Sequence, residues 1–159
     1  MNEQPQVTHT ELLEYQTERL QDLIKEIVEC CEDRKFYESQ RFSLPYAQLT
    51  CLMLFNGERY LTVKTIAERL DVAKSRVTKL VSGLLDKGLI ERIEDPRDGR
   101  IKLLSLSPKG MKVTKDIEIL QKDIHRKILL QMTPDERRNM LSYVEFLHSA
   151  MEAVKEELV

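Results

Sequence analysis

Apolar residues recur near both ends of the chain at the spacing of one helical face. The first long segment, about Thr10 to Glu38, predicts a helix, because its apolar positions lie three and four residues apart. These positions are Leu20, Leu23, Ile24, Ile27, Val28 and Cys31. A shorter helix is expected from Ser43-Leu44-Pro45 to Asn56-Gly57, a pair suited to a left-handed C-terminal turn.

Two helices are expected to close the chain. Ser107-Pro108 offers an N-cap followed by proline at the first helical position, and Thr133-Pro134 repeats the signal, with Glu136 completing a capping box. Behind each start runs one narrow apolar stripe, which favours packing against a partner chain. The stripes are Val113, Ile117, Leu120, Ile124 and Ile128, then Met140, Val144, Leu147, Met151, Val154 and Leu158. We expect a homodimer with Leu20, Ile24, Ile27, Val144, Leu147 and Met151 in its interface.

The middle of the chain has the spacing of a helix-turn-helix. A helix starting near Thr62 turns Ile66, Ala67 and Leu70 inward, and the short connection Asp71-Val72-Ala73 leads into a second helix anchored by Val77 and Leu80. Lys87-Gly88 ends that second helix. Its outward side chains provide cations for phosphates and hydrogen-bonding groups for base edges. They are Lys74, Ser75, Arg76, Thr78 and Lys79.

A β-hairpin is expected directly after the second helix. The strand-like runs 89–94 and 101–106 flank Asp95-Pro96-Arg97-Asp98-Gly99-Arg100, in which Asp98-Gly99 is a strong hairpin signal. Arg97 and Arg100 lie at the tip of this wing, where an arginine can enter a DNA minor groove. The fold class is therefore mainly α with a small β-hairpin wing, a winged helix-turn-helix flanked by N- and C-terminal dimerisation helices.

Charge is unevenly distributed along the chain. The 159 residues carry a formal net charge of −2, yet residues 62–110 hold eleven Lys/Arg and seven Asp/Glu, a net of +4 against −6 elsewhere. A basic middle segment concentrates positive potential in the expected DNA-binding region. The polar start of the chain lacks a secretory signal, and no apolar run approaches the roughly 18 residues that span a membrane. We expect a cytoplasmic protein without membrane contact.

The segment Leu61–Gly110, centred on the wing sequence 95–100, resembles the MarR family of bacterial regulators. Leu44-Pro45-Tyr46-Ala47-Gln48-Leu49 is similar to the family's segment before its helix-turn-helix, and Leu106–Gly110 to the segment that follows its wing. The resemblance implies three parts: a dimerisation helix in 1–43, a winged helix-turn-helix in 44–110, and dimerisation helices in 111–159. It also implies a homodimer on a palindromic, inverted-repeat DNA operator.

The resemblance assigns roles to individual residues. Ser75, Arg76, Thr78 and Lys79 would enter the major groove, and Arg97 would be the minor-groove residue of the wing. Asp95, Asp98 and Arg100 would hold the shape of the wing by pairing, with Gly99 in its turn. A small phenolic or amphipathic effector, which relieves repression in this family, would bind a pocket near Phe36, Tyr46 and Leu49.

Two residues depart from the family pattern. Ala73 stands where a serine often caps the recognition helix, and the loss of such a cap costs roughly 0.5–2 kcal/mol. Gly83 lies inside that helix, where glycine costs about 1 kcal/mol relative to alanine. Neither departure removes a side chain that would face DNA.

Other functions find less support in the sequence. A Gly-rich phosphate loop, a nucleophile elbow and a metal-ligand cluster are all missing, so we expect no enzyme, no metal and no cofactor. One alternative is a winged helix that binds protein. Another is thiol-based redox sensing, although Cys31 on the apolar face and Cys51 in an apolar run are more typical of buried, inert thiols than of sensors. Cys30 points away from that face.

Overall fold

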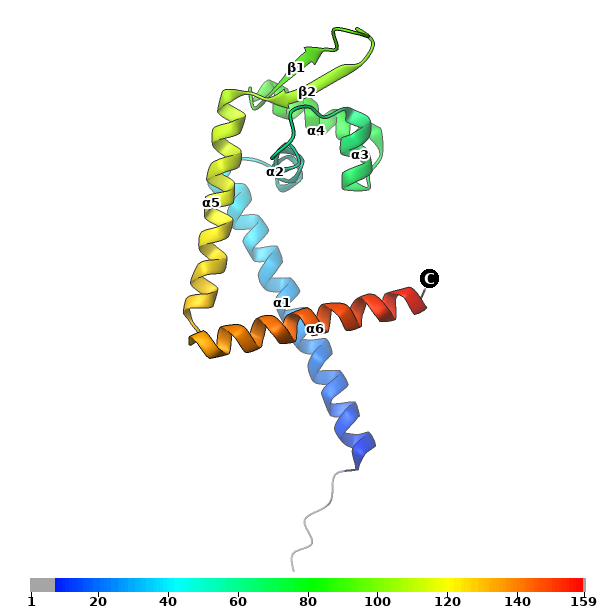
Figure 1. Cartoon of the computed structure of the whole chain (residues 1–159), viewed down its shortest axis with the longest axis vertical. Coiled ribbons are helices and arrows are strands. Elements are labelled where there is room, and N and C mark those ends of the chain that lie inside the picture. Colours follow the sequence, from blue (N-terminus) through cyan, green and yellow to red (C-terminus); the bar gives the residue numbers. More distant parts are fainter. Residues whose placement is uncertain (1–7, 159) are drawn as a thin grey trace, which may run out of the picture. The chain divides into compact units, whose positions relative to one another are not determined.

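The computed structural model describes residues 8–158, in six helices and one two-stranded antiparallel sheet (Figure 1). The elements are α1 (His9–Phe42), α2 (Tyr46–Met53), α3 (Val63–Leu70), α4 (Lys74–Asp86), β1 (Ile90–Glu94), β2 (Lys102–Leu106), α5 (Pro108–Leu130) and α6 (Pro134–Glu157). The expected fold class is confirmed. The chain start on which the expectation of no secretory signal rests, residues 1–7, lies outside the described part.

The described chain divides into two compact units, at a point within α5 between Thr114 and Lys115. The first unit contains α1 to β2 and the first turns of α5, and the second contains the remainder of α5 and α6. The buried apolar side chains lie in the first unit, with the exception of Ile117 on α5. The fully buried side chains of the first unit include Leu49, Leu52, Phe55, Ile66, Leu84, Ile90 and Leu104.

Helix α1 begins within one residue of the predicted start at Thr10 and extends four residues beyond the predicted end at Glu38. Thr8 is the N-cap, and it forms a capping box in which the Glu11 amide donates to the Thr8 hydroxyl and the Thr8 amide donates to the Glu11 carboxylate. The Glu11 carboxylate accepts hydrogen bonds from both the amide and the hydroxyl of Thr8, and these two bonds lower the pKa of Glu11. The helix ends at Ser43, whose φ of 51° is left-handed. Its apolar stripe lies exposed in the single chain, and Glu38 is the buried residue of the helix.

Helices α3 and α4 form the expected helix-turn-helix. The Thr62 hydroxyl caps α3 by accepting from the Thr65 amide at 3.1 Å, and Asp71 ends α3 with a left-handed φ of 52°. The amide of Val72 then donates to the carbonyl of Ala67 at 3.1 Å, which closes the turn. Val77 is buried on α4, where it anchors the helix as expected.

The wing pairs β1 with β2 in antiparallel register, from Ile90 opposite Leu106 to Glu94 opposite Lys102. Leu61 adds a bridge on the other side of β2, donating to and accepting from Leu104 at 2.9 and 2.8 Å. This bridge ties the segment before α3 to the wing. The sequence pattern did not indicate it, because one paired residue has no periodicity.

Helix α6 has a capping box at Thr133 and Glu136, as the sequence predicts. The Glu136 carboxylate accepts the Thr133 amide, and this hydrogen bond lowers the pKa of Glu136. In the second unit, Arg137 Nε donates to the carbonyls of Leu129 and Met132 at 2.7 and 3.0 Å, which fixes the connection between α5 and α6. None of the described residues of α6 is buried.

Candidate nucleic-acid interface

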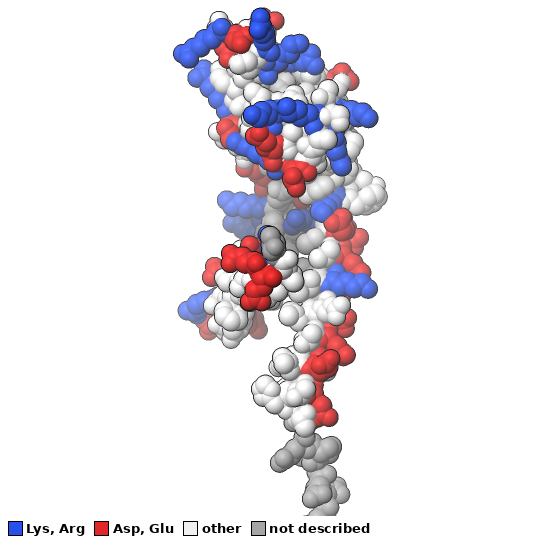
Figure 2. All heavy atoms as spheres, turned by 90° about the vertical axis from the view of Figure 1, so that its right-hand side faces the viewer, with Lys and Arg blue, Asp and Glu red and all other residues white. Residues whose placement is uncertain are grey.

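The outer surface of α4 carries the predicted recognition residues. Val77, Val81 and Leu84 are buried on one side of the helix. All five candidate DNA-facing side chains are exposed on the other side, namely Lys74, Ser75, Arg76, Thr78 and Lys79. Figure 2 shows Lys and Arg gathered over the part of the molecule that Figure 1 assigns to α3, α4 and the wing. One sequence segment therefore supplies both a core face and a polar, cationic face.

The hydrogen bonds and ion pairs of α4 determine which of its side-chain donors, acceptors and cations are available to a ligand. The Thr78 hydroxyl donates to the carbonyl of Lys74 at 2.9 Å, so its oxygen is left as an acceptor. In the described structure Arg76 and Lys79 form no ion pair with an acidic residue, which leaves their cations available to phosphates or bases. Ala73 provides no side-chain cap, as its identity predicts.

The loop of the wing comprises residues 95–101, and it is longer than a two-residue Asp-Gly turn. Asp95 and Asp98 each accept a backbone amide two residues ahead, from Arg97 at 2.8 Å and from Arg100 at 2.9 Å. The amide of Ile101 then donates to the carbonyl of Asp98 at 3.0 Å. The two carboxylates thus shape the wing through backbone hydrogen bonds, where side-chain pairing was expected.

Gly99 adopts an ordinary backbone conformation, since Gly57 and Gly88 are the glycines with positive φ in the described chain. The mirror-image turn that an Asp-Gly pair favours needs positive φ at both central residues. Asp98 instead starts a turn whose hydrogen bond spans four residues, for which an aspartate at the first position is favourable. Arg97 and Arg100 are exposed beside it.

The structure reveals further exposed cations, on the wing and on α3, that were not among the site residues predicted from the sequence. Arg92 on β1 and Lys102 on β2 are exposed, although the register places them on the sheet face of the buried Ile90 and Leu104, so strand alternation does not indicate them. Lys64 on α3 and Lys74 on α4 both line an open groove of about 480 Å³. The Lys64 ammonium is 3.8 Å from the Glu68 carboxylate, and both side chains are largely exposed, so this pair leaves Lys64 accessible.

Ser107 joins the end of α4 to the start of α5. Its hydroxyl donates to the carbonyl of Gly88 at 2.6 Å and accepts from the amide of Gly110 at 3.0 Å. A Cβ on Gly110 would lie 1.9 Å from the carbonyl oxygen of Leu89, so only glycine fits there. The predicted N-cap is present, and it also bonds to the turn that ends the recognition helix.

The expected interface residues of the terminal helices are accessible in the single chain. Leu20 and Ile27 on α1 are 44% and 60% exposed, and Val144 and Met151 on α6 are 53% and 51% exposed. Ile24 and Leu147 are half-buried. A shallow apolar groove of about 430 Å³ follows α6, lined by Glu136, Asn139, Met140, Tyr143, Val144 and Leu147.

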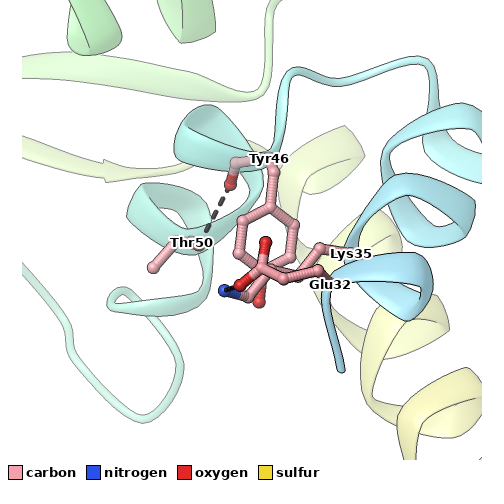
Figure 3. Close-up of polar contacts among 4 residues, drawn as sticks. All are labelled: Glu32, Lys35, Tyr46 and Thr50. Atoms are coloured by element: carbon pink, nitrogen blue, oxygen red, sulfur yellow. Dashed lines mark hydrogen bonds and ion pairs between the residues drawn. The ribbon is translucent and has the colours of Figure 1, made fainter. Parts of the chain in front are cut away.

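The three residues expected around an effector differ in accessibility. Phe36 is 66% exposed and Tyr46 is half-buried, whereas Leu49 is 1% exposed and has almost no surface for a ligand. The Lys35 ammonium lies 5.6 Å from the centre of the Tyr46 ring and is paired with Glu32 (Figure 3). The hydrogen bond to Glu32 raises the pKa of Lys35. The α1–α2 junction is therefore a charged and aromatic surface.

The cysteines divide into one buried and two exposed thiols. Cys51 is fully buried in the core, and burial raises its pKa to about 11. Cys31 was expected to be buried, and this was wrong for the single chain, in which Cys30 and Cys31 are both exposed on α1. Cys31 does lie on the apolar face of α1, but among residues 8–158 none covers this thiol.

Some kinds of site are missing from residues 8–158. No three His, Cys, Asp or Glu side chains in this range are grouped to hold a metal ion. Among the helices described here, none is long and apolar enough to cross a membrane.

A helix-turn-helix followed by a β-hairpin, with cations on both, defines a winged helix-turn-helix protein. The model of the MarR family matches residues 42–101. The chain is 26% identical over 106 residues to the HTH-type transcriptional regulator BilQ of Clostridioides difficile, covering 67% of this chain and 72% of BilQ. The resemblance to the MarR family that the sequence predicts is therefore confirmed by the family model over residues 42–101.

Solved structures share the fold. A mutant of MepR from S. aureus has a TM-score of 0.78 at 21% identity, covering 82% of this chain and 97% of that one. YusO of Bacillus subtilis has a TM-score of 0.69 at 26% identity, covering 92% and 99%. A second MepR mutant, bound to an oligodeoxyribonucleotide, has a TM-score of 0.66 at 20% identity, covering 83% and 97%.

Proposed function

We propose that this chain binds double-stranded DNA as a homodimer and represses transcription from an inverted-repeat operator. The observation that carries the proposal is the outer face of α4, where five polar or cationic side chains stand exposed beside a wing tipped with two exposed arginines. Arg76 and Lys79 have the chemistry to contact guanine edges and phosphates. MepR, which shares the fold, has been solved with an oligodeoxyribonucleotide bound.

The proposed role of each residue in DNA binding follows from the chemistry of its side chain. On α4, Ser75, Arg76, Thr78 and Lys79 read base edges in the major groove, while Lys74 contacts phosphate. On the wing, Arg97 enters the minor groove, with Arg100 beside it. Asp95, Asp98 and Gly99 form the loop that presents both arginines, since the two carboxylates accept the arginine amides. These cations lie in the 44–110 segment, between dimerisation helices in 1–43 and 111–159.

The dimer is supported by the terminal helices. Residues of α1 and α6 that repeat at helical spacing keep about half of their surface exposed, and α6 buries no side chain among its described residues. A helix with an apolar stripe and no core gains stability only when a partner covers the stripe. A second copy of this chain offers the matching stripes, with Leu20, Ile24, Ile27, Val144, Leu147 and Met151 in the contact.

A small amphipathic or phenolic effector completes the proposal, as the resemblance to the MarR family implies. The accessible groups near the expected position are Phe36, the Tyr46 ring and the Lys35 ammonium above it, while Leu49 contributes to the core. An aromatic anion suits such a surface, because it combines ring contact with charge complementarity. A panel of phenolic acids should lower DNA affinity, and substitution of Tyr46 by alanine should abolish that response.

One selection experiment tests the central proposal. The purified full-length protein is mixed with a randomised duplex library at physiological salt, and the retained fragments are sequenced. We expect inverted repeats with half-sites about one helical turn apart, roughly 10–10.5 base pairs. Direct repeats or asymmetric sites would contradict the two-fold dimer. Retention of no duplex, together with a salt-insensitive protein complex, would favour a winged helix that binds protein.

A further inference from the structure

The side chain of Gln48 on α2 fills the space beside Gly83, a glycine inside α4. A Cβ built on Gly83 of α4 would lie 2.2 Å from Nε2 of Gln48 and 3.1 Å from its Cδ. At the other side of the same amide, Gln48 Oε1 accepts a hydrogen bond from Lys87 Nζ at 2.8 Å. Gly83 and Lys87 are about one turn apart on α4. The Gln48 amide therefore lies across one turn of the helix, and we call Gln48, Gly83 and Lys87 the α2–α4 latch.

The same end of α4 is also fastened to α5. The carbonyl of Lys87 accepts from Lys109 Nζ at 2.9 Å, and the next carbonyl, that of Gly88, accepts from the Ser107 hydroxyl. Lys87 thus contacts α2 through its side chain and α5 through its backbone. At the opposite end α4 has no side-chain cap. The polar contacts that orient α4 are concentrated at its C-terminal end.

This arrangement accounts for the glycine inside the helix. Gly83 has helical backbone and no positive φ, so its conformational freedom is not the reason for its presence. Alanine would favour the helix by about 1 kcal/mol. What glycine provides is room for the Gln48 amide, since any side chain at this position would push the amide away from Lys87.

A small change in the tilt of α4 at the α2–α4 latch would cause a larger displacement at the N-terminal end of the helix, which carries the proposed DNA contacts. Arg76 lies roughly 16 Å along the helix axis from Lys87, at a rise of about 1.5 Å per residue. A tilt of about 5° around the C-terminal end would displace Arg76 by roughly 1.4 Å by the same geometry. Hydrogen bonds to base edges tolerate only a few tenths of an ångström.

We propose that Gln48 and Lys87 are positioning residues for DNA recognition, which set the tilt of α4 through the gap at Gly83. The inference rests on the proposed DNA-binding function. It differs from a role in folding, because the latch fixes the direction of a helix whose core residues are already buried. It also differs from a phosphate contact, because the Lys87 ammonium is bonded to Gln48.

The test compares full-length variants on two duplexes. One duplex is the strongest site that the wild type selects from the randomised library, and the other is a scrambled version. Gln48→Ala and Gly83→Ala should each lose about tenfold in affinity for the selected duplex and little for the scrambled one. Because both changes open one latch, the double variant should lose no more than either single variant. Gln48→Glu keeps an acceptor for Lys87 and should bind like the wild type.

Two further readouts separate positioning from other effects. Gly83→Ala should not lower the thermal midpoint, because the added methyl favours the helix, so a loss of affinity without a loss of stability supports the latch. Lys87→Met should lose selectivity with an unchanged salt dependence of binding, whereas a slope reduced by about one shows a phosphate contact and overturns the inference.

The inference is also overturned if Gln48→Ala and Gly83→Ala bind the selected duplex like the wild type, or if their losses multiply in the double variant. Failure of the wild type to select any duplex is a separate result. It refutes the proposed function and removes the basis of the latch.

Discussion

Ser107→Ala tests the joint between α4 and α5. The hydroxyl makes two hydrogen bonds in a buried setting, at 2.6 Å to the Gly88 carbonyl and at 3.0 Å from the Gly110 amide. Loss of a helix N-cap costs roughly 0.5–2 kcal/mol. Loss of a neutral hydrogen bond costs roughly 0.5–1.5 kcal/mol. We therefore expect the free energy of unfolding to fall by about 2 kcal/mol.

The assay is urea unfolding followed by far-ultraviolet circular dichroism. The protein concentration must be held fixed, because the stability of a dimer depends on it. Ser82→Ala is the matched control, since Ser82 is exposed on α4, and its free energy of unfolding should change by less than about 0.5 kcal/mol. If Ser107→Ala and Ser82→Ala have the same free energy of unfolding, with equal slopes against urea concentration, the two hydrogen bonds of Ser107 contribute nothing to stability and the reasoning is wrong.

Three other outcomes follow from the structure. Leu147→Asp should give monomers or insoluble protein, because it places a charge in the proposed dimer contact, and a wild-type dimer in sedimentation would contradict that contact. Arg97→Ala should weaken binding to selected and scrambled duplexes alike and lower the salt slope by about one, whereas Arg76→Ala should lose roughly 1–3 kcal/mol on the selected duplex alone. Equal binding of wild type and Arg97→Ala across the salt range would refute the wing assignment. Finally, Cys51 should keep its proton in the folded chain up to about pH 11, while an unfolded thiol ionises near pH 9.0. Stability that the neutral thiol provides is present below pH 9 and is lost as the pH rises toward 11. The advantage of the wild type over Cys51→Ala in unfolding free energy should thus shrink by about 1 kcal/mol between pH 7.5 and pH 10, and a constant difference would contradict the raised pKa.

The sequence predicted those elements whose signals are local. The caps at Thr62, Ser107 and Thr133 each bond to an amide three residues ahead, so their effect is contained in four consecutive residues. The helix-turn-helix was predictable for a similar reason, because its buried positions follow the helical period. The exposure of the α4 cations follows from the same period, once the buried face is known.

Contacts between distant residues were not predictable from a pattern. Gln48 and Lys87 are 39 residues apart, and nothing in the sequence near Gly83 indicates that an amide fills the space beside it. Gly83 therefore looked like a defect before its neighbour was known. The exposure of Cys31 was missed for a different reason, because its place on the apolar face of α1 predicted burial, whereas the single chain leaves this thiol exposed.

The wing loop has a consequence for how this protein can change over generations. Its shape depends on the carboxylates of Asp95 and Asp98, while Gly99 has ordinary φ and open space around the position of a Cβ. Position 99 can therefore accept many side chains, including arginine or asparagine, at little cost to the fold. Under the proposed function, new DNA preferences can arise by single substitutions at the tip, ahead of any change in α4.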